Sequence, residues 1–205
     1  MQGYILNINL VKDEDLIVTI LTPKKIKTLY RFYGARHSTI QLGYQLDFAS
    51  IASNSSNIPQ LREVLHLASS WLHNNRRFFI WQQFIKLLFT HLKDVQELDT
   101  FYFLLLEKMN HKFEKQNPKR VVVESYIEIL NHEGRVHNDF ICFICEEEIE
   151  DQTTLARALL PAHSCCVMGK EIKKEKIQKL FKTNSTLFLE DDEVDYIWQI
   201  IQLGF

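Results

Sequence analysis

The hydrophobic period of the sequence changes near Pro59, and this change limits the folds that the chain can adopt. Before it, short stretches with near period-two patterns alternate with turn-like residues, as in small all-β domains. These stretches cover residues 3–10, 16–21, 26–33 and 42–48. After it, apolar residues recur every three or four positions, as on the buried face of a helix. The pattern predicts an α+β protein that begins with a small barrel or a strongly curled sheet.

The helical part begins after a Ser/Asn-rich tract at residues 50–59, which we interpret as a domain boundary. Strong apolar stripes follow at residues 81–92 and 101–113. Asn117 and Pro118 form a typical helix start, and Gly134 a typical stop. Two further helices are expected around residues 172–181 and 193–203.

All four cysteines lie between residues 142 and 166. Cys142 and Cys145 have the two-residue spacing of a zinc knuckle, and His163 and Cys166 repeat that spacing downstream. Two such pairs can close a tetrahedral Zn²⁺ site of three thiolates and one imidazole. Cys165 is then a spare thiol, or it replaces His163 as a ligand.

Three alternatives to a structural zinc site are compatible with the cysteine spacing. The cysteines can be small buried hydrophobic residues, a thioredoxin-type pair or a catalytic zinc site. Clustering argues against the first, and the flanking pattern against the second. A catalytic zinc would also need an open position and a positioned acid or base, which the sequence does not indicate.

A basic stretch with aromatic residues lies in the strand-rich part. Residues 22–37 contain five basic residues and no acid, although the chain as a whole has a net charge of −2. If residues 25–33 form a β-strand, every second residue from Lys25 to Tyr33 lies on one face. The cations on that face can bind the phosphates of single-stranded nucleic acid, and the ring of Tyr33 can stack on a base. The predicted contacts are Lys24, Lys25, Lys27, Arg31, Tyr33 and Arg36. The alternative is an ordinary solvated strand whose lysines prevent edge-to-edge aggregation.

Lys119 and Arg120 are a weaker candidate site. They stand at a predicted helix N-terminus, where positive charge opposes the helix dipole. Such a placement can mark a partner contact, or it can be a tolerated surface pair.

Several classes of protein receive no support from the sequence. Apolar runs are too short for a membrane helix, and the first residues are unlike a signal peptide, so we expect a cytoplasmic protein. His132, Glu133 and His137 miss the spacing of a zinc-protease motif, and no phosphate-binding glycine motif occurs.

The order of these features resembles the RecO family of bacterial DNA-repair proteins over nearly the full length, in the compact form of epsilon-class bacteria. The similar pieces are Gly3-Tyr4-Ile5-Leu6, Glu14-Asp15, the run from Ile17 to Thr22, Tyr33-Gly34-Ala35-Arg36, a helical middle and the two ligand pairs. The chain differs from the family in three ways. It is short, it has Pro-Lys-Lys after Thr22 where a glycine is usual, and it has His163 where a cysteine is usual.

The resemblance implies a fold and a domain plan. It implies an OB-fold DNA-binding domain at 1–52, a helical domain at 59–138, a zinc-finger-like segment at 139–170, and C-terminal helices at 171–205 that pack on the helical domain.

The resemblance also implies a non-enzymatic, nucleoid-associated recombination mediator. Such proteins bind single- and double-stranded DNA, anneal strands, and with RecR help load RecA. They also bind the acidic tail of single-stranded DNA-binding protein, for which Lys119 and Arg120 are the candidates here. The alternatives are a zinc- or thiol-dependent enzyme acting on nucleic acid, and a pure interaction scaffold.

Overall fold

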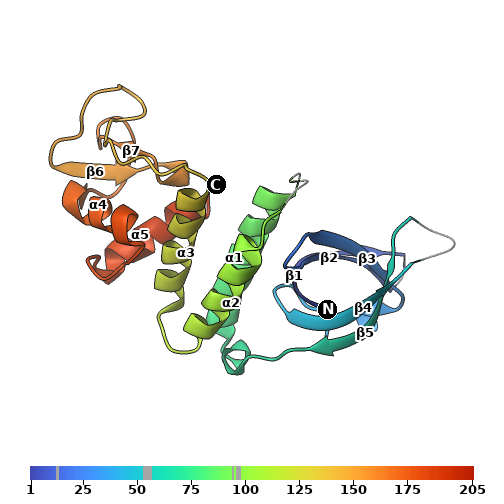
Figure 1. Cartoon of the computed structure of the whole chain (residues 1–205). Coiled ribbons are helices and arrows are strands. Elements are labelled where there is room, and N and C mark those ends of the chain that lie inside the picture. Colours follow the sequence, from blue (N-terminus) through green and yellow to red (C-terminus); the bar gives the residue numbers. More distant parts are fainter. Residues whose placement is uncertain (13, 53–56, 94, 96–97) are drawn as a thin grey trace. The chain divides into compact units, whose positions relative to one another are not determined.

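The computed structural model describes residues 1–12, 14–52, 57–93, 95 and 98–205. The chain divides into two compact units, Met1–Glu114 and Lys115–Phe205 (Figure 1). Each unit is described below by itself. Among the described residues, no helix is both long and apolar enough to cross a membrane.

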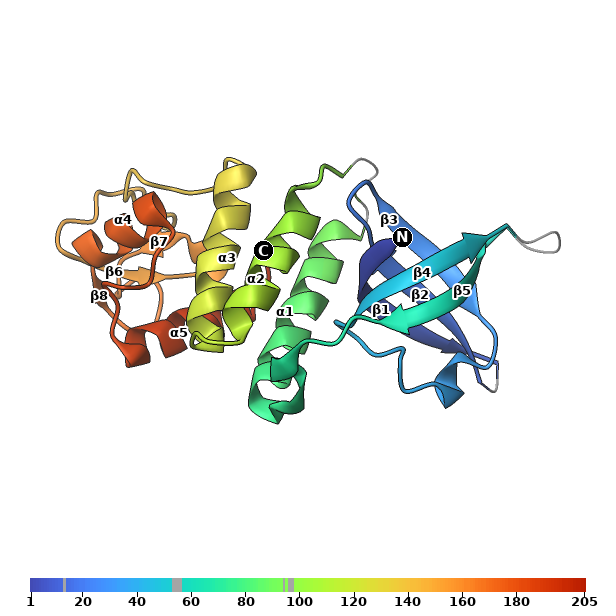
Figure 2. The same cartoon turned by 60° about the horizontal axis from the view of Figure 1, so that its bottom comes forward.

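Unit 1 begins with a closed five-stranded barrel (Figure 2). Its strands are β1 (Gln2–Val11), β2 (Asp15–Leu21), β3 (Ile26–Arg31), β4 (Gln45–Ile51) and β5 (Gln60–His66). They close in the order β1-β2-β3-β5-β4, antiparallel except where β3 meets β5. Alternate residues of each strand fill the interior, for example Val18, Ile20 and Leu46. The structure thus confirms an OB-type barrel followed by helices.

The barrel extends beyond residue 52, where the sequence analysis placed its end. β5 pairs with β4 over five positions, so residues 50–59 connect two barrel strands. Residues 53–56 of that tract lie outside the described part of the chain. β5 is hard to recognise because it carries Arg62 and Glu63 side by side, and Glu63 has a positive φ of 50°.

Two helices complete unit 1, α1 (Asn75–Leu92) and α2 (Phe101–Phe113). Asn74 caps α1 by accepting a hydrogen bond from the Arg77 N–H. Trp81 of α1 is fully buried, and its indole N–H donates to the Gly43 carbonyl at 2.9 Å. This bond fixes α1 to the loop that precedes β4.

Unit 2 combines three helices with a small sheet. The helices are α3 (Pro118–His132), α4 (Lys174–Thr183) and α5 (Asp191–Ile201), and the sheet has the order β7-β6-β8 with strands Pro161–Ala162, Gln152–Leu155 and Ile172–Lys173. α3 begins as the sequence predicts, because Asn117 accepts a hydrogen bond from the Lys119 N–H and Pro118 occupies the first turn. Gly134, with a φ of +68°, follows the end of α3.

Candidate metal centre and nucleic-acid interface

Two loops of unit 2 bring the metal-ligand candidates together. The first is a hairpin in which the Ile149 N–H donates to the Phe140 carbonyl and the Cys142 N–H donates to the Glu147 carbonyl, both at 2.9 Å. Its turn carries Cys142 and Cys145. The second loop follows β7 and is closed by a hydrogen bond from the Cys166 N–H to the His163 carbonyl at 3.0 Å.

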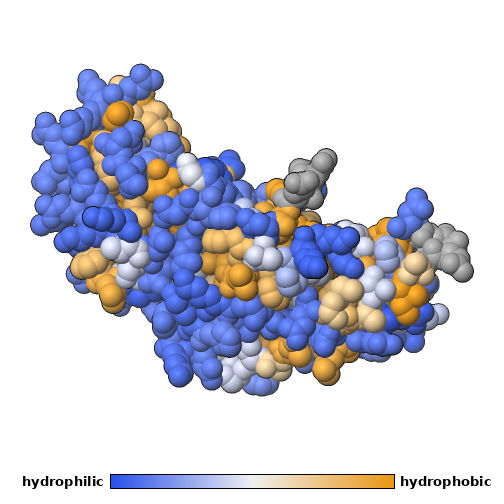
Figure 3. Space-filling view, in the orientation of Figure 1, coloured by the Kyte–Doolittle hydropathy of each residue, from blue (hydrophilic) through white to orange (hydrophobic). Residues whose placement is uncertain are grey.

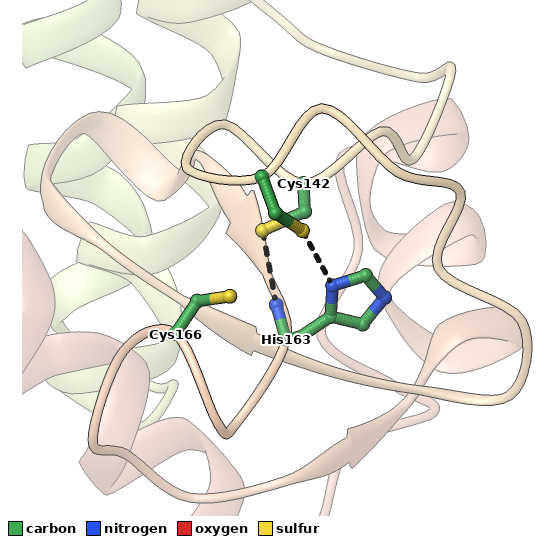
Figure 4. Close-up of side chains that lie close together, drawn as sticks. Cys142, His163 and Cys166 are labelled. Carbon is green, nitrogen blue, oxygen red and sulfur yellow. Dashed lines mark hydrogen bonds between the residues drawn. The ribbon is translucent and has the colours of Figure 1, made fainter.

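The four predicted donor atoms form one cluster. The Sγ atoms of Cys142, Cys145 and Cys166 and a ring nitrogen of His163 all lie within 4.8 Å of one another. In a tetrahedral zinc site, bond lengths of about 2.0–2.3 Å place neighbouring donors roughly 3.5–3.8 Å apart. Cys145 Sγ lies 3.3 Å from His163 Nδ1, and Figure 4 shows the labelled side chains pointing toward a common centre. The cluster is therefore close enough to hold a metal ion.

Contacts behind the donors orient them for a metal. His163 Nε2 lies 3.2 Å from the Glu148 carbonyl oxygen. If Nε2 carries the ring proton and donates to that carbonyl, the Nδ1 lone pair faces the three sulfurs. Such a second hydrogen bond is the usual partner of a metal-binding imidazole. The His163 backbone N–H also donates to Cys142 Sγ at 3.4 Å (Figure 4).

The thiols differ in acidity because they occupy different environments. Burial acts to raise the pKa of Cys142, but backbone N–H groups of Cys145, His163 and Ile144 face its sulfur and lower the pKa to about 6. Burial, followed by hydrogen bonds from the neighbouring thiols, raises the pKa of Cys166 to about 12. The cluster thus stabilises one thiolate by itself, and a cation would be needed to hold three.

Cys165 lies outside this donor group. Its side chain is exposed, and its Sγ lies 4.0 Å from Cys166 Sγ. Among the described residues, the group that could hold a metal includes His163 and not Cys165. Of the two alternatives from sequence, the geometry supports Cys165 as the spare thiol.

The predicted nucleic-acid contacts fall into two groups on the barrel. Lys24 and Lys25 are exposed in the turn between β2 and β3, which Thr22 holds by donating its hydroxyl to the Lys25 carbonyl at 2.7 Å. Lys25 and Lys27 also line an open hollow of about 220 Å³. The other residues lining this hollow are Ile26, Thr28, Leu29, Ser50 and Pro59. Within the described part of the chain, the side chains of these lysines form no hydrogen bond or ion pair, so they can meet a phosphate chain without breaking one.

The remaining cations are engaged within the barrel. Leu29 lies in the core, so the face of β3 that also carries Lys27 and Arg31 points inward at its middle rather than to solvent. Arg31 donates to the Leu61 carbonyl at 3.0 Å. Desolvation, then the charge of Arg62, lowers the pKa of Arg31. Arg31 is therefore a poor free phosphate contact.

Tyr33 and Arg36 belong to a turn that two acidic residues hold in place. Asp15 accepts hydrogen bonds from the Tyr33 N–H at 2.8 Å and from the Tyr30 hydroxyl, and these donors, the hydroxyl first, lower the pKa of its carboxyl. Arg36 forms an ion pair with Glu14 and lies 5.3 Å above the Tyr33 ring. Tyr33 stays largely exposed, but the charge of Arg36 is compensated locally.

Arg62 is a further basic residue of the barrel, which the pattern of residues 60–66 does not indicate as a nucleic-acid contact. It is exposed on β5, which meets β3 in the barrel, and its charge acts on Arg31. Its side chain bonds only to Gln60 among the hydrogen bonds of the described residues. Among the sequence patterns, only the weak strand pattern of residues 60–66 could have placed Arg62 on the barrel.

Lys119 and Arg120 have structural partners inside unit 2. Lys119 forms an ion pair of 2.7 Å with Asp195 of α5. Arg120 donates to the carbonyls of Thr186 and Leu189 at 2.6 and 2.9 Å and pairs with Asp191 at 2.7 Å. Arg120 therefore holds the α4–α5 connection against the start of α3.

We expect Arg120→Met to destabilise unit 2 by about 2 kcal/mol, because it leaves two carbonyls without their charged donor. Lys119→Met should change the free energy of unfolding by less than about 0.5 kcal/mol, since it removes a single ion pair whose Asp195 carboxylate is exposed to water. Urea denaturation of both variants measures the difference. Equal effects would show that the carbonyl contacts of Arg120 carry little stability.

Comparison with known families supports the barrel assignment. Residues 1–72 match the family model described as RecO N terminal. The match covers all five barrel strands and reaches Leu72 in the short helix η2 (Ser70–His73) that precedes α1. A search of curated proteins found no match to the chain. The barrel and the family match therefore show that residues 1–72 are similar to the N-terminal domain of RecO proteins.

Proposed function

We propose that the protein is a recombination mediator in DNA repair. In this role it binds single- and double-stranded DNA, anneals complementary strands, and with RecR helps load RecA onto DNA coated by single-stranded DNA-binding protein at the nucleoid. The observation that carries the proposal is the match of the closed barrel to the RecO N-terminal family. The family supports a RecO-like DNA-repair role in general, and the named partners belong to the proposal.

The barrel offers a route for a DNA strand. Lys24 and Lys25 stand at the β2–β3 turn, Lys27 borders the adjacent hollow, and Tyr33 is exposed at the other end of β3. Cations spaced along a strand can follow the phosphates, and an exposed ring can stack on a base. Arg36 can add a contact only if DNA competes with Glu14 for its charge, and Arg31 only if it leaves Leu61.

The proposed occupant of the metal cluster is Zn²⁺. Three thiolates and one imidazole, carried in pairs by two loops, match the donor set of structural zinc sites. When bound, the ion would join the hairpin at residues 140–149 to the loop after β7. Four protein donors complete a tetrahedron and leave no position for a reacting water, which favours a structural role over the alternative of a zinc-dependent nucleic-acid enzyme.

A strand-annealing assay tests the function. Two complementary, fluorophore-labelled oligonucleotides should anneal faster with the protein than without it. The reaction should need no nucleoside triphosphate, and gel analysis should show both strands covalently unchanged. Strand cleavage or modification would support the enzyme alternative, and an absence of salt-sensitive DNA affinity would support a pure interaction scaffold.

The salt dependence of single-strand binding tests the proposed interface. Three or four phosphate contacts should give a log–log salt slope of about −2 to −3, at about 0.7 per contact. Replacing Lys24, Lys25 and Lys27 together by Ala should reduce the magnitude of that slope by about two. Fluorescence anisotropy over a series of salt concentrations measures it.

The matched control replaces three exposed lysines outside the barrel strands, Lys86, Lys93 and Lys115, by Ala. This variant should keep the parent slope. The opposite result would be a smaller salt slope for the control variant and an unchanged slope for the barrel variant. It would assign the DNA site to the region after the barrel.

The proposed partner site at Lys119 and Arg120 needs a careful test. Both cations are used within unit 2, so charge reversal at Arg120 would also disturb the fold. Lys119→Glu is the informative variant for binding of a peptide from the acidic tail of single-stranded DNA-binding protein. Loss of tail binding with unchanged annealing would support the site.

A further inference from the structure

The hairpin that carries Cys142 and Cys145 has two unlike faces. Phe140, Cys142 and Ile149 are buried. Ile141 points the other way, because side chains alternate along a strand and Ile141 is bridged to Glu148 in an antiparallel pair. Phe143 and Ile144 lie in the turn that follows. Ile141, Phe143 and Ile144 are 45%, 42% and 54% exposed. We call these three residues the knuckle face.

The knuckle face keeps a cluster of apolar side chains in water. Three large hydrophobic residues within four positions leave about half of their surface exposed, which is unfavourable unless another molecule covers them. Phe140 and Ile149 already supply the core of the hairpin, and Cys142 is a buried metal donor. The knuckle face is therefore not required for the fold of the hairpin itself.

The surroundings of the knuckle face are acidic. Residues 139–156 contain six acids and neither lysine nor arginine. The acids beside the knuckle are exposed, and Glu148 pairs with Lys174 at 3.6 Å. In the described part of the chain, residues 146–151 form no other ion pair. A filled zinc site would not reverse this charge, since three thiolates outweigh a divalent ion.

This charge selects the kind of partner. A negative rim repels nucleic-acid phosphates and an acidic peptide, and it attracts lysine and arginine. The apolar centre requires a partner with hydrophobic side chains of its own. In the space-filling view, hydrophobic patches lie among hydrophilic surface over the part of unit 2 that carries β6 and β7 (Figure 3).

We propose that the knuckle face is a docking surface for a protein segment that presents hydrophobic anchors flanked by basic residues. The anchors cover Ile141, Phe143 and Ile144, and the flanking cations pair with Glu146, Glu147 and their acidic neighbours. The charge of this surface is opposite to that of the basic turn of the barrel, so the two surfaces select different ligands.

The test measures binding of a fluorescein-labelled probe peptide, about twelve residues long, that combines lysines with leucine and phenylalanine. Fluorescence anisotropy with the full chain should give affinity at least tenfold tighter than for two control peptides. One control has serine in place of the apolar residues, and the other has glutamate in place of lysine. Equal affinity for the lysine–serine peptide would overturn the proposal, because it would reduce the interaction to charge alone.

Variants of the full chain locate the site. Phe143→Ser with Ile144→Ser should weaken probe binding at least tenfold, and Glu146→Gln with Glu147→Gln should weaken it several-fold. The controls are Leu187→Ser, at an 84% exposed residue of unit 2, and Glu175→Gln, on the exposed side of α4. These should stay within twofold of the parent. Control losses as large as those of the knuckle variants would overturn the proposal.

Two further measurements keep the result interpretable. Metal content per chain and the DNA salt slope should be unchanged in the knuckle variants, which shows that the hairpin and the barrel remain folded. Sedimentation of the parent tests a different occupant. A dimer that Phe143→Ser abolishes would assign the knuckle face to a second copy of this chain and reject the basic partner.

Discussion

Cys142→Ser is expected to abolish stoichiometric zinc binding and to destabilise unit 2 by several kcal/mol. Structural zinc sites contribute roughly 10 kcal/mol or more of apparent binding free energy, which is folding free energy when the unfolded chain has no preformed site. Cys142 is fully buried, and the N–H of His163 points at its sulfur. Serine is a poor zinc ligand, and its shorter C–O bond would leave these contacts unmade.

The measurements are metal content per chain and thermal unfolding with and without chelator. The parent should hold close to one zinc per chain and lose thermal stability when the metal is removed. Hydrogen exchange should show faster exchange in β6 and β7 of the variant, with the barrel strands unchanged. Cys165→Ser is the matched control and should retain both zinc and stability. A metal-free parent as stable as the loaded protein would contradict the structural role.

Gly43→Ala is expected to destabilise unit 1 by about 3–6 kcal/mol. Gly43 has a φ of +84°, a conformation that costs an L-residue roughly 1–2 kcal/mol. A Cβ there would lie 2.5 Å from Trp81 Nε1, so the indole must move. Overpacking adds about 1–3 kcal/mol, and loss of the hydrogen bond to the Gly43 carbonyl adds about 1 kcal/mol.

Gly134→Ala separates backbone strain from crowding. Gly134 also has a positive φ, of +68°, but a Cβ at this position meets nothing within 4 Å. Gly134→Ala should therefore lower the free energy of unfolding only by the backbone strain, roughly 1–2 kcal/mol. Urea denaturation followed by tryptophan fluorescence compares the two variants. Equal losses would mean that the Trp81 contact contributes little to the attachment of α1.

The parts of the structure that could be predicted from sequence are those that depend on local pattern. Period-two stretches indicated four of the five barrel strands, and Asn117 with Pro118 indicated the start of α3. The two ligand pairs could be matched because their spacing reflects a local turn geometry that zinc imposes. The structure brings these four residues together although eighteen or more positions separate the pairs.

The remaining features depend on contacts between distant segments. The position of β5 is determined by its pairing with β3 and β4. Its own sequence is too polar to predict a strand. Alternation showed that Lys27, Leu29 and Arg31 share a face, but only the closed barrel decides that this face turns inward at Leu29. The partners of Arg120 lie more than sixty residues away, so its role in unit 2 could not be predicted from its neighbours in sequence.

The placement of the donors on two loops has a consequence for how the chain depends on its environment. A bound ion would act as a reversible cross-link that closes the 25 residues from Cys142 to Cys166, and so would restrict the unfolded chain much as a disulfide does. Unlike a disulfide, its contribution would vary with the concentration of free metal. Scarcity of the ion would loosen unit 2 alone, since the barrel contributes no donor to the cluster.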